Sequence, residues 1–447
     1  QFHPEVLHTE RGIEILSNFV FGICRCKAEW KMGNYAEAME KEIKETVKNG
    51  HALALVSGGI DSVLACLLAG KALGKRLHAI HMDTGLLRKD ESRLVKQSLQ
   101  KLGIGLEVVD CSQAFLAALA DVHEPEEKRK IIGDLFVKAF EAEVGKLGLD
   151  IGKTYLVQGT LYTDLIESGK GSGDKADKIK THHNVASPLI EKLRQEGRVI
   201  EPNRDIFKDE VRKLSAMLGI PKGVYSRHPF PGPGLGVRII SNLGYVGDWK
   251  KGIEDCRKIA KEHGFEIAVL PVKSVGVQGD ARTYRNVAML TGKQDWKGMR
   301  KACERMVKTT RQVNRVVYVL QAEQEIPQRS AERLCQLSLG KEHLDLLREA
   351  DSIANSVLAE SGLYDRVSQM PVVLFPGISR PWVCIRDVAT EDFMTARPLE
   401  KPGEMPWACL QEMAEKIMAS KEIEALGGVE GVCIDITDKP PATIEWE

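Results

Sequence analysis

The sequence has no long hydrophobic run, no excess of charge of either sign and no regular cysteine spacing. No apolar stretch approaches the roughly 20 residues that a membrane-spanning helix needs, so we expect no membrane association. The 63 basic residues are matched by 63 acidic ones. This balance argues against a protein that requires nucleic acid, because such proteins usually carry a basic excess or patch. We find no signal-peptide pattern, no long low-complexity segment and no internal repeat.

The ten cysteines are scattered along the chain. Cys24 and Cys26 form a C-x-C pair, but there is no C-x-x-C motif and no Cys/His spacing typical of a zinc site. This pattern predicts reduced thiols in or near the core of a cytoplasmic (cytosolic) protein. Of the 447 residues, 43% are hydrophobic and 28% are charged. These values are typical of a globular protein, and the length allows two or three domains.

A short apolar run at Ala52–Val56 stops at the polar loop Ser57–Ser62 (SGGIDS), and an apolar stretch at Val63–Leu73 follows. This order predicts a strand, a phosphate-binding loop and a helix. Two glycines let the backbone approach a ligand closely, and a helix N-terminus favours an anion. The alternative is a tight turn in which Ser62 caps the helix. Asp61 favours the phosphate loop, because an acid beside bound phosphates suits a bridging Mg²⁺ ion.

Strands and helices alternate through the first half of the chain. The expected strands after Ala52–Val56 are Arg76–Met82, Leu106–Asp110 and Thr154–Gln158, and the expected helices include Trp30–Lys48, Glu91–Leu102 and Glu126–Leu147. This alternation predicts an α/β fold with a doubly wound parallel sheet. Ligands of such sheets bind beyond the carboxyl ends of the strands. The loops after Val56, Met82 and Gln158 should therefore converge on one crevice.

The pattern changes in the second half of the chain. The Gly- and Lys-rich segment Gly169–Lys180 predicts a mobile loop, and the Pro/Gly-rich stretch Arg227–Leu235 predicts a domain boundary. Beyond it we expect an α+β domain. Its expected elements are strands at Val237–Ile240, Glu266–Val272, Val316–Leu320, Val372–Leu374 and Val432–Ile436, with a helix at Asp255–Glu262.

The loop S-G-G-x-D-S resembles that of the ATP pyrophosphatase family, whose members cleave ATP between the α- and β-phosphates and adenylate a substrate oxygen. Four further stretches resemble the GMP synthetase family within it: IKTHHN with DEVR, SRHPFPGPGLGVRI, VGVQGDARTY and the terminal DKPPATIEWE. The resemblance implies a sheet of the adenine nucleotide α-hydrolase-like type in residues 27–232, after the remnant of a glutamine amidotransferase domain in residues 1–26. Residues 233–447 would form an α+β XMP-binding and dimerisation domain, with an insertion near 321–368 as in longer, animal-type members.

The resemblance also implies a reaction, the ATP-dependent amination of xanthosine 5′-monophosphate (XMP) to GMP, with ATP and Mg²⁺ as cofactors. Asp61 would bind Mg²⁺, and Lys180 would neutralise charge on the leaving pyrophosphate. From the residues alone, Arg88 could instead be a solvated surface side chain and the two adjacent histidines a chance pair. The implied site residues are Ser57, Gly58, Gly59, Ile60, Asp61, Ser62 and Val63 for ATP and pyrophosphate, Arg88, Asp280, Gln369, Lys439 and Glu445 for XMP, and Lys180, Thr181, His182 and His183 for a lid.

The end of the chain combines Pro440-Pro441 with Glu445 and Trp446. A terminal Lys/Glu pair around prolines would normally be a solvated tail. The rigid proline pair and the nearby tryptophan favour a docked tail. We therefore expect residues 439–447 to be ordered near the phosphate-loop crevice, on the chain's own body or on a partner chain.

The opening QFHPEV resembles the end of a class I glutamine amidotransferase domain, in which a histidine and a glutamate, here His3 and Glu5, assist a cysteine nucleophile. The matching cysteine would lie upstream of Gln1. We therefore expect either a fragment of a longer enzyme, which the missing initiator Met favours, or a synthetase that uses free ammonia. The implied partners are XMP, ATP and ammonia from glutamine, and the chain would be a monomer or a homodimer.

Two other functions fit the same loop. A tRNA-thiolating ATP pyrophosphatase would be expected to show a basic face and catalytic cysteines, which the balanced charge and the cysteine spacing oppose. A non-enzymatic nucleotide sensor would not need to keep Asp61, Lys180 and Arg88 together.

We predict that the purified 447-residue chain forms GMP from XMP and ATP with ammonium and fails to do so with glutamine. The reason is that His3 and Glu5 cannot hydrolyse glutamine without a nucleophile. Release of AMP, measured with each nitrogen source, tests this. Glutamine-dependent activity in a pure preparation would contradict it.

Overall fold

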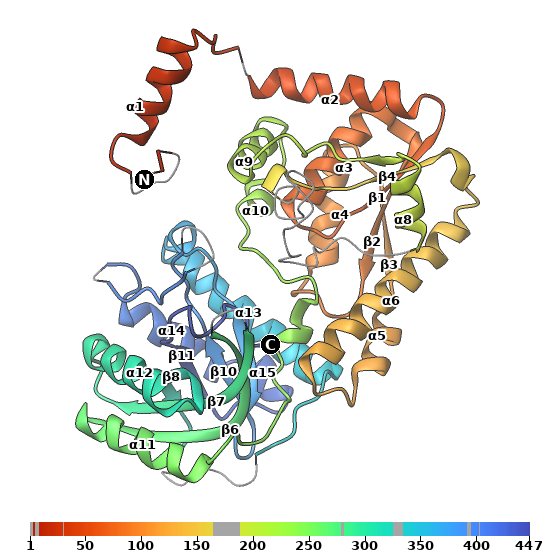
Figure 1. Cartoon of the computed structure of the whole chain (residues 1–447). Helices are drawn as coiled ribbons and strands as arrows, with labels where there is room; N and C mark the ends of the chain where they lie inside the picture. The colour runs from red at the N-terminus through yellow and green to blue at the C-terminus, as the bar shows by residue number, and fades with distance from the viewer. Residues whose placement is uncertain are drawn as a thin grey trace.

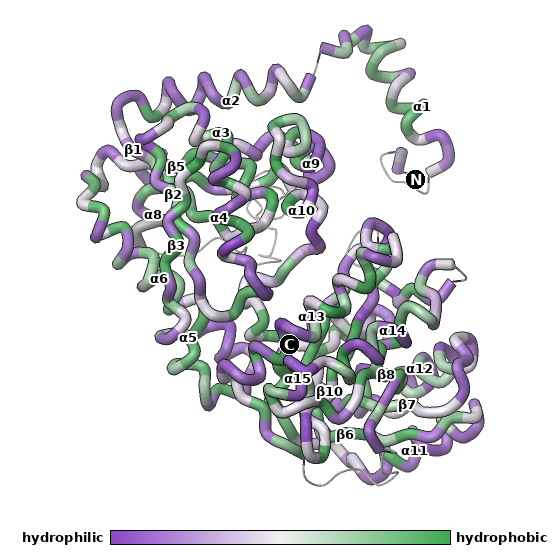
Figure 2. The backbone as a smooth tube through the Cα atoms, turned by 180° about the vertical axis from the view of Figure 1, so that it is seen from behind, coloured by the Kyte–Doolittle hydropathy of each residue, from purple (hydrophilic) through white to green (hydrophobic). Residues whose placement is uncertain are grey.

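The computed structural model describes residues 3–4, 9–29, 31–163, 188–278, 281–324, 334–390, 395–401 and 403–447. It contains one β-sheet in the first half of the chain and another in the second half (Figure 1). Near the N-terminus, α1 (Gly12–Ser17) and the π-helix η1 (Asn18–Ile23) stand apart from both sheets (Figure 1). They nevertheless carry hydrophobic residues (Figure 2), and Ile13 and Ile23 are each 73% exposed.

The first sheet is parallel throughout, with the order β3-β2-β1-β4-β5, which confirms the predicted doubly wound α/β fold. The strand order reverses between β1 and β4, which is where ligands bind in sheets of this kind. The strands are β1 (His51–Leu55), β2 (Leu77–Asp83), β3 (Leu106–Asp110), β4 (Thr154–Val157) and β5 (Val199–Ile200).

Helices cover both faces of this sheet. On one face α3 (Ile60–Leu73) is apolar on all sides, because it lies between the sheet and the helices α2 (Met32–Val47) and α9 (Lys208–Met217). On the other face, α6 (Pro125–Lys146) packs Phe140 against alternate strand residues such as Leu53. The remaining helices here are η2 (Gly74–Arg76), α4 (Glu91–Lys101), α5 (Ser112–Leu119), η3 (Ile151–Lys153), α8 (Pro188–Gln195) and α10 (Lys222–Tyr225).

The second sheet is mixed, with the order β6-β7-β8-β11-β10-β9. Its strands are β6 (Phe265–Gln278), β7 (Ala281–Gly292), β8 (Val313–Ala322), β9 (Val372–Pro376), β10 (Pro381–Ile385) and β11 (Gly431–Asp435). The helices of this half are η4 (Gly234–Val237), α11 (Trp249–Glu262), α12 (Trp296–Thr310), α13 (Lys341–Glu360), η5 (Tyr364–Arg366), α14 (Trp407–Met418) and α15 (Lys421–Ala425).

The second sheet consists of two units with the same topology. In each unit the first two strands are antiparallel and the last two are parallel, β6-β7-β8 in one and β9-β10-β11 in the other. A helix precedes each unit, and helices connect its last two strands: α12 in the first unit, and α14 with the short α15 in the second. The units join through the antiparallel pair β8 and β11 at the centre of the sheet. The sequence showed no internal repeat, yet the backbone topology repeats, because topology can repeat while side chains differ.

The strand expected at Val237–Ile240 is also wrong. Val237 ends the 3₁₀ helix η4, and Ile239 forms only a single bridge with Leu374 of β9. Val237, Ile239 and Ile240 are all completely buried. The apolar run therefore reflects a buried connection between the two halves, which a short hydrophobic pattern cannot distinguish from a strand.

The C-terminal tail is ordered and docked on the chain's own body, which is one of the two expected arrangements, whereas its position near the phosphate-loop crevice stays a prediction. Trp446 is completely buried and stacks on Phe375, with ring centroids 5.4 Å apart. The carboxylate of Glu447 lies 2.5 Å from Lys128 Nζ of α6, and neither side chain is exposed to solvent. These contacts go to α6 and to the second sheet, and the tail is part of the core. Deletion of the tail would therefore test folding, and point variants are needed to test binding.

Most cysteines are buried, as expected, but Cys24 and Cys26 are exposed. Burial raises the pKa of Cys66, Cys256 and Cys303 to about 12, so these thiols are poor nucleophiles. Among the described residues, no helix has both the length and the apolar character needed to cross a bilayer.

We predict that Trp446→Ala lowers the free energy of unfolding by about 3–5 kcal/mol, because it removes a large, fully buried ring. Phe19→Ala is the control, since Phe19 is 55% exposed, and it should change stability by less than about 0.5 kcal/mol. Urea unfolding of both variants measures the difference. Equal stabilities would show that the tail contributes nothing to the core.

Candidate active site

The loop between β1 and α3 is closed by its two serines. Ser57 Oγ lies 3.0 Å from Ser62 Oγ and accepts a hydrogen bond from Gly59 N at 3.3 Å. Ser62 Oγ also donates to the carbonyl of Gly59 at 2.9 Å. Gly58 has a φ of +89°, a conformation that favours glycine. The loop is therefore held in one shape at the N-terminus of a buried helix, where an anion is favoured.

The three polar loops converge, as expected. A Cβ atom on Gly159, in the loop after β4, would lie 2.7 Å from the carbonyl carbon of Asp61. A Cβ atom on Gly58 would lie 3.4 Å from a carboxylate oxygen of Glu91, at the start of α4 after β2. The backbone thus packs so closely around the phosphate loop that only glycine fits at Gly159 without a shift.

Asp61 has the surroundings of a cation ligand. Its Oδ2 forms an ion pair with Lys208, and its backbone carbonyl accepts a hydrogen bond from Asn203 Nδ2 at 2.8 Å. Its Oδ1 is buried and accepts no hydrogen bond from any described residue. One carboxylate beside a phosphate loop is the donor set that Mg²⁺ uses when substrate phosphates supply further oxygens. The residues present therefore fit the predicted metal.

Lys208 was missed by the sequence reasoning. It lies 147 positions after Asp61, and only the packing of α9 against α3 brings the two side chains together. The available signal was the DEVR stretch, which begins at the next residue. Lys208 Nζ supplies a positive charge at the same carboxylate that would bind a metal ion.

A buried histidine connects the phosphate loop to the loop after β2. His81 Nδ1 lies 2.6 Å from the carbonyl oxygen of Val56, and Nε2 lies 3.1 Å from Ser92 Oγ. Ser92 donates to Asp83 at 2.6 Å, and the other oxygen of Asp83 accepts from Gly85 N at 3.0 Å. This polar chain orients the loop that carries Arg88.

Arg88 is half-buried and held in place, so it is not a solvated surface side chain. Its Nη2 donates to the carbonyls of His228 and Pro229, both at 3.2 Å. Its guanidinium lies 4.4 Å from the centre of the Phe230 ring. It borders a cavity of about 160 Å³, which α13 closes on the far side. The RHPFPGPGL stretch thus serves as a support for Arg88.

Gln369 and Glu445 belong to the same cluster. Arg238 donates to both carboxylate oxygens of Glu445, at 3.0 and 2.8 Å. Gln369 Nε2 donates to Pro229 O at 3.2 Å and to Glu445 Oε1 at 3.3 Å. The structure therefore brings together three of the five residues predicted to bind XMP: Arg88 and Gln369 contact segment 228–230, and Glu445 joins them through Gln369.

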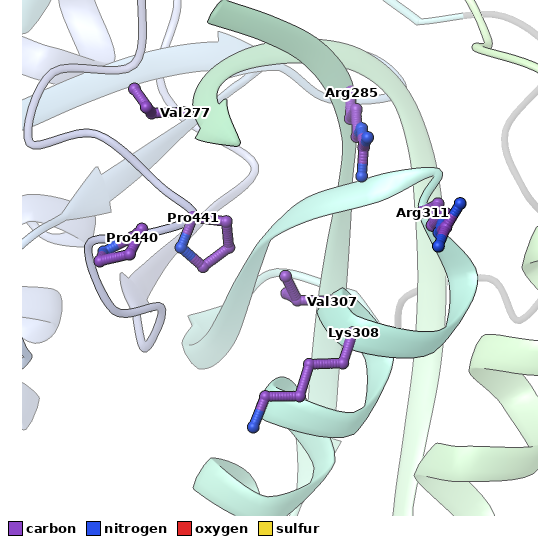
Figure 3. Close-up of a pocket in the computed structure, with 7 residues that line it drawn as sticks. All are labelled: Val277, Arg285, Val307, Lys308, Arg311, Pro440 and Pro441. Atoms are coloured by element: carbon purple, nitrogen blue, oxygen red, sulfur yellow. The ribbon is translucent and has the colours of Figure 1, made fainter. Parts of the chain in front are cut away.

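Lys439 follows β11 and lies outside the strands of the second sheet, where it forms an isolated bridge with Ala396. Its backbone exchanges hydrogen bonds with Ala396, at 3.0 and 2.8 Å. The following Pro440 and Pro441 line a cavity of about 460 Å³ opposite β7 and the end of α12 (Figure 3). The other residues that line it are Val277, Arg285, Val307, Lys308 and Arg311. The role of the Lys439 side chain at the nucleotide site stays a prediction.

Several predicted site residues lie outside the described residues: Glu5, Asp280, and the lid residues Lys180, Thr181, His182 and His183. Their roles also stay predictions. His3 is described and exposed.

Comparison with known proteins identifies two regions. Residues 356–446 match the family described as GMP synthase C terminal domain, and residues 34–139 match the family described as NAD synthase. The chain is 40% identical to a probable glutamine-hydrolyzing GMP synthase of Leptospira interrogans, over 100% of this chain and 72% of that protein. It is 35% identical to a GMP synthase of Dictyostelium discoideum, over 100% of this chain and 70% of that one. It is 42% identical to a GMP synthase of Aquifex aeolicus, over 71% of this chain and 65% of that protein.

We predict that Lys208→Met strengthens the binding of a divalent cation at Asp61 in the absence of nucleotide. Removal of a competing positive charge should lower the dissociation constant by up to about fivefold, which corresponds to the roughly 1 kcal/mol of a half-exposed ion pair. Titration with Mn²⁺ followed by electron paramagnetic resonance measures this. Lys213→Met is the control on the same helix, and an unchanged Mn²⁺ affinity in Lys208→Met would contradict the prediction.

Proposed function

The chain belongs to the family of glutamine-hydrolyzing GMP synthases, and we propose that it catalyses the ATP-dependent amination of XMP to GMP. The chain spans 72% of the length of the Leptospira relative. One observation carries the proposal. A single loop, between β2 and α4, has the phosphate loop on one side, through Glu91 beside Gly58, and the Arg88 cluster on the other. ATP and a second nucleotide can therefore meet there.

The reaction has two steps. In the first, O2 of XMP attacks the α-phosphorus of ATP, the bond to the bridging oxygen breaks, and pyrophosphate leaves. In the second, ammonia attacks C2 of the adenylylated xanthine, and AMP leaves with the electron pair of the C–O bond. The phosphate loop, Ser57 to Val63, would hold the leaving pyrophosphate with backbone N–H groups and the helix N-terminus.

Two cations would neutralise the charge that builds on pyrophosphate. Mg²⁺, held by Asp61, would supply Lewis-acid stabilisation to the phosphate oxygens. Lys208 would lie near the same phosphates, because its amine contacts Asp61. We propose that Lys180, Thr181, His182 and His183 close over ATP from the lid, where Lys180 adds a third positive charge.

XMP would bind in the cluster on segment 228–230. The flat guanidinium of Arg88 suits the purine oxygens or the phosphate. Glu445 can accept a hydrogen bond from a base or ribose donor, and two hydrogen bonds from the Arg238 guanidinium already orient its carboxylate. Gln369 offers an amide beside it. We propose that Asp280 and Lys439 also bind XMP, as the resemblance implies.

The nitrogen source remains part of the proposal. We infer that ammonia normally comes from glutamine, hydrolysed by an amidotransferase domain to which His3 and Glu5 belong. A cytosolic location and a monomer or homodimer are consistent with this role.

We predict that the purified chain releases AMP and pyrophosphate only when XMP, ATP and Mg²⁺ are present together. Asp61→Asn should slow AMP release about a hundredfold, because the leaving group loses its metal. Arg88→Ala should raise the KM for XMP about tenfold and leave the KM for ATP unchanged, since a charge-assisted contact is lost from one substrate only. Steady-state assays of AMP release measure all three values.

Arg93→Ala is the matched control for Arg88, because Arg93 lies five residues further on and its side chain is 57% exposed. It should behave as the parent chain does. AMP release that is independent of XMP, or near-normal activity of Asp61→Asn, would refute the proposed function.

A further inference from the structure

Helix α13 holds the loop that carries Arg88 from the side opposite the phosphate loop. Arg348 Nε donates to the carbonyl of Leu87 at 2.9 Å, and its Nη2 donates to the carbonyl of Gly85. Its third nitrogen is paired with Asp345, one turn earlier in the same helix. The side chain is only 18% exposed. One guanidinium thus binds two backbone carbonyls, those of the residues one and three positions before Arg88.

The same loop is restrained on its other edges. Leu235 N donates to the carbonyl of Leu86 at 2.7 Å, so all three successive carbonyls from Gly85 to Leu87 accept hydrogen bonds from the second half of the chain. The next residue, Lys89, forms an ion pair of 2.6 Å with Glu349, which neighbours Arg348 on α13. The backbone before Arg88 is therefore held by α13 and by Leu235, and the side chain of the residue after it is paired with α13.

Arg88, Gln369 and Glu445 form the proposed nucleotide cluster, and helix α13 also reaches its other side. Asp351 lies 3.9 Å from Arg238, and Arg238 holds Glu445. Asp351, Ser352 and Asn355 line the cavity of about 160 Å³ that Arg88 borders. Arg88 and Glu445, which lie on two sides of the cluster, are thus supported by the same helix.

The contact of residue 348 with the loop requires the planar guanidinium of an arginine. Two N–H groups of a guanidinium can bind two separate carbonyls at the same time in a fixed geometry. A lysine ammonium is a point charge on a flexible stem and would satisfy one of them. Without Arg348, the carbonyls of Gly85 and Leu87 would lose their partner, and the backbone from which the Arg88 side chain extends would be less restrained.

We propose that Arg348 is a positioning residue for XMP, which acts by fixing the Gly85–Leu87 backbone so that Arg88 points into the nucleotide cavity. The proposal rests on the proposed function. It predicts that Arg348 affects the binding of one nucleotide and not of the other, because the phosphate loop is closed by its own serines.

The test compares Arg348→Ala, Arg348→Lys, Arg88→Ala and the double variant Arg88→Ala/Arg348→Ala in the full chain. Arg348→Ala should raise the KM for XMP roughly tenfold, with the KM for ATP within about twofold of the parent. Arg348→Lys should recover only part of the loss. In the Arg88→Ala background, loss of Arg348 should have no further effect on the KM for XMP, since its action passes through Arg88.

The control is Lys222→Ala, which removes an exposed ion pair of 3.0 Å with Asp365 between the same two halves without touching the loop. It should leave both KM values unchanged. Hydrogen–deuterium exchange of the Thr84–Glu91 peptide, without nucleotide, gives a second readout. Exchange should rise in Arg348→Ala and in Arg348→Lys and stay at the parent level in Lys222→Ala.

An unchanged KM for XMP in Arg348→Ala would overturn the proposal, and so would effects that add fully in the double variant. Unchanged exchange in the loop would also overturn it. If Arg348→Ala does not fold, the partial loss and the exchange in Arg348→Lys decide the question. A parent chain that lacks XMP-dependent activity would refute the proposed function instead, and the exchange experiment would still report whether Arg348 fixes the loop.

Discussion

The end of the chain is the constraint on which both halves of the structure depend. Glu447 is paired with Lys128 of α6, and Glu445 with Arg238 of the connection between the two sheets. Lys128 also donates to the carbonyl of Ile239 at 2.9 Å. All these charges are buried or nearly so, and a buried charge without its partner costs about 3–5 kcal/mol. The last three residues therefore tie the parallel sheet to the mixed sheet and place Glu445 in the nucleotide cluster at the same time.

The junction between the two halves of the chain also explains why the candidate site lies at the loop after β2. Leu86, Phe115 and Ile132 of the first half share one hydrophobic cluster with Leu235 and Ile239. That cluster fixes the backbone of the loop after β2, while polar contacts from Asp83, Arg348 and Leu235 satisfy its backbone groups. At the proposed site, a rigid loop between the two substrates would lower the entropy cost of bringing an XMP oxygen to the α-phosphorus of ATP.

The repeated topology of the second sheet gives residues 321–368 a structural meaning. This stretch contains the end of β8 and the whole of α13, and it leads into the second unit of the sheet. Its predicted status as an insertion remains a prediction. In the structure it supplies the helix that supports Arg88, so it belongs to the site as much as to the scaffold.

The sequence by itself determined the local elements and the chemistry of the phosphate loop. The alternation of apolar runs with the SGGIDS turn is enough to place β1, α3 and Asp61, because these depend on neighbours within a few residues. The motifs RHPFPGPGL and KPPATIEWE likewise indicated which segments build the nucleotide cluster. What they could not indicate is which side chains meet, because that depends on contacts between residues far apart in the chain.

Only the tertiary structure paired Asp61 with Lys208, Glu445 with Arg238 and the Arg88 loop with Arg348. The separations are 147, 207 and about 260 residues, and nothing in a local pattern of period 2 or 3.6 carries such pairings. The same limit applies to Val237–Ile240, whose apolar residues record burial without specifying a strand. It applies also to the two-unit sheet, since backbone hydrogen bonding can repeat where side chains do not. Propensity and periodicity act within one element, whereas packing and buried charge act across the whole chain. The site is formed by packing and buried charge.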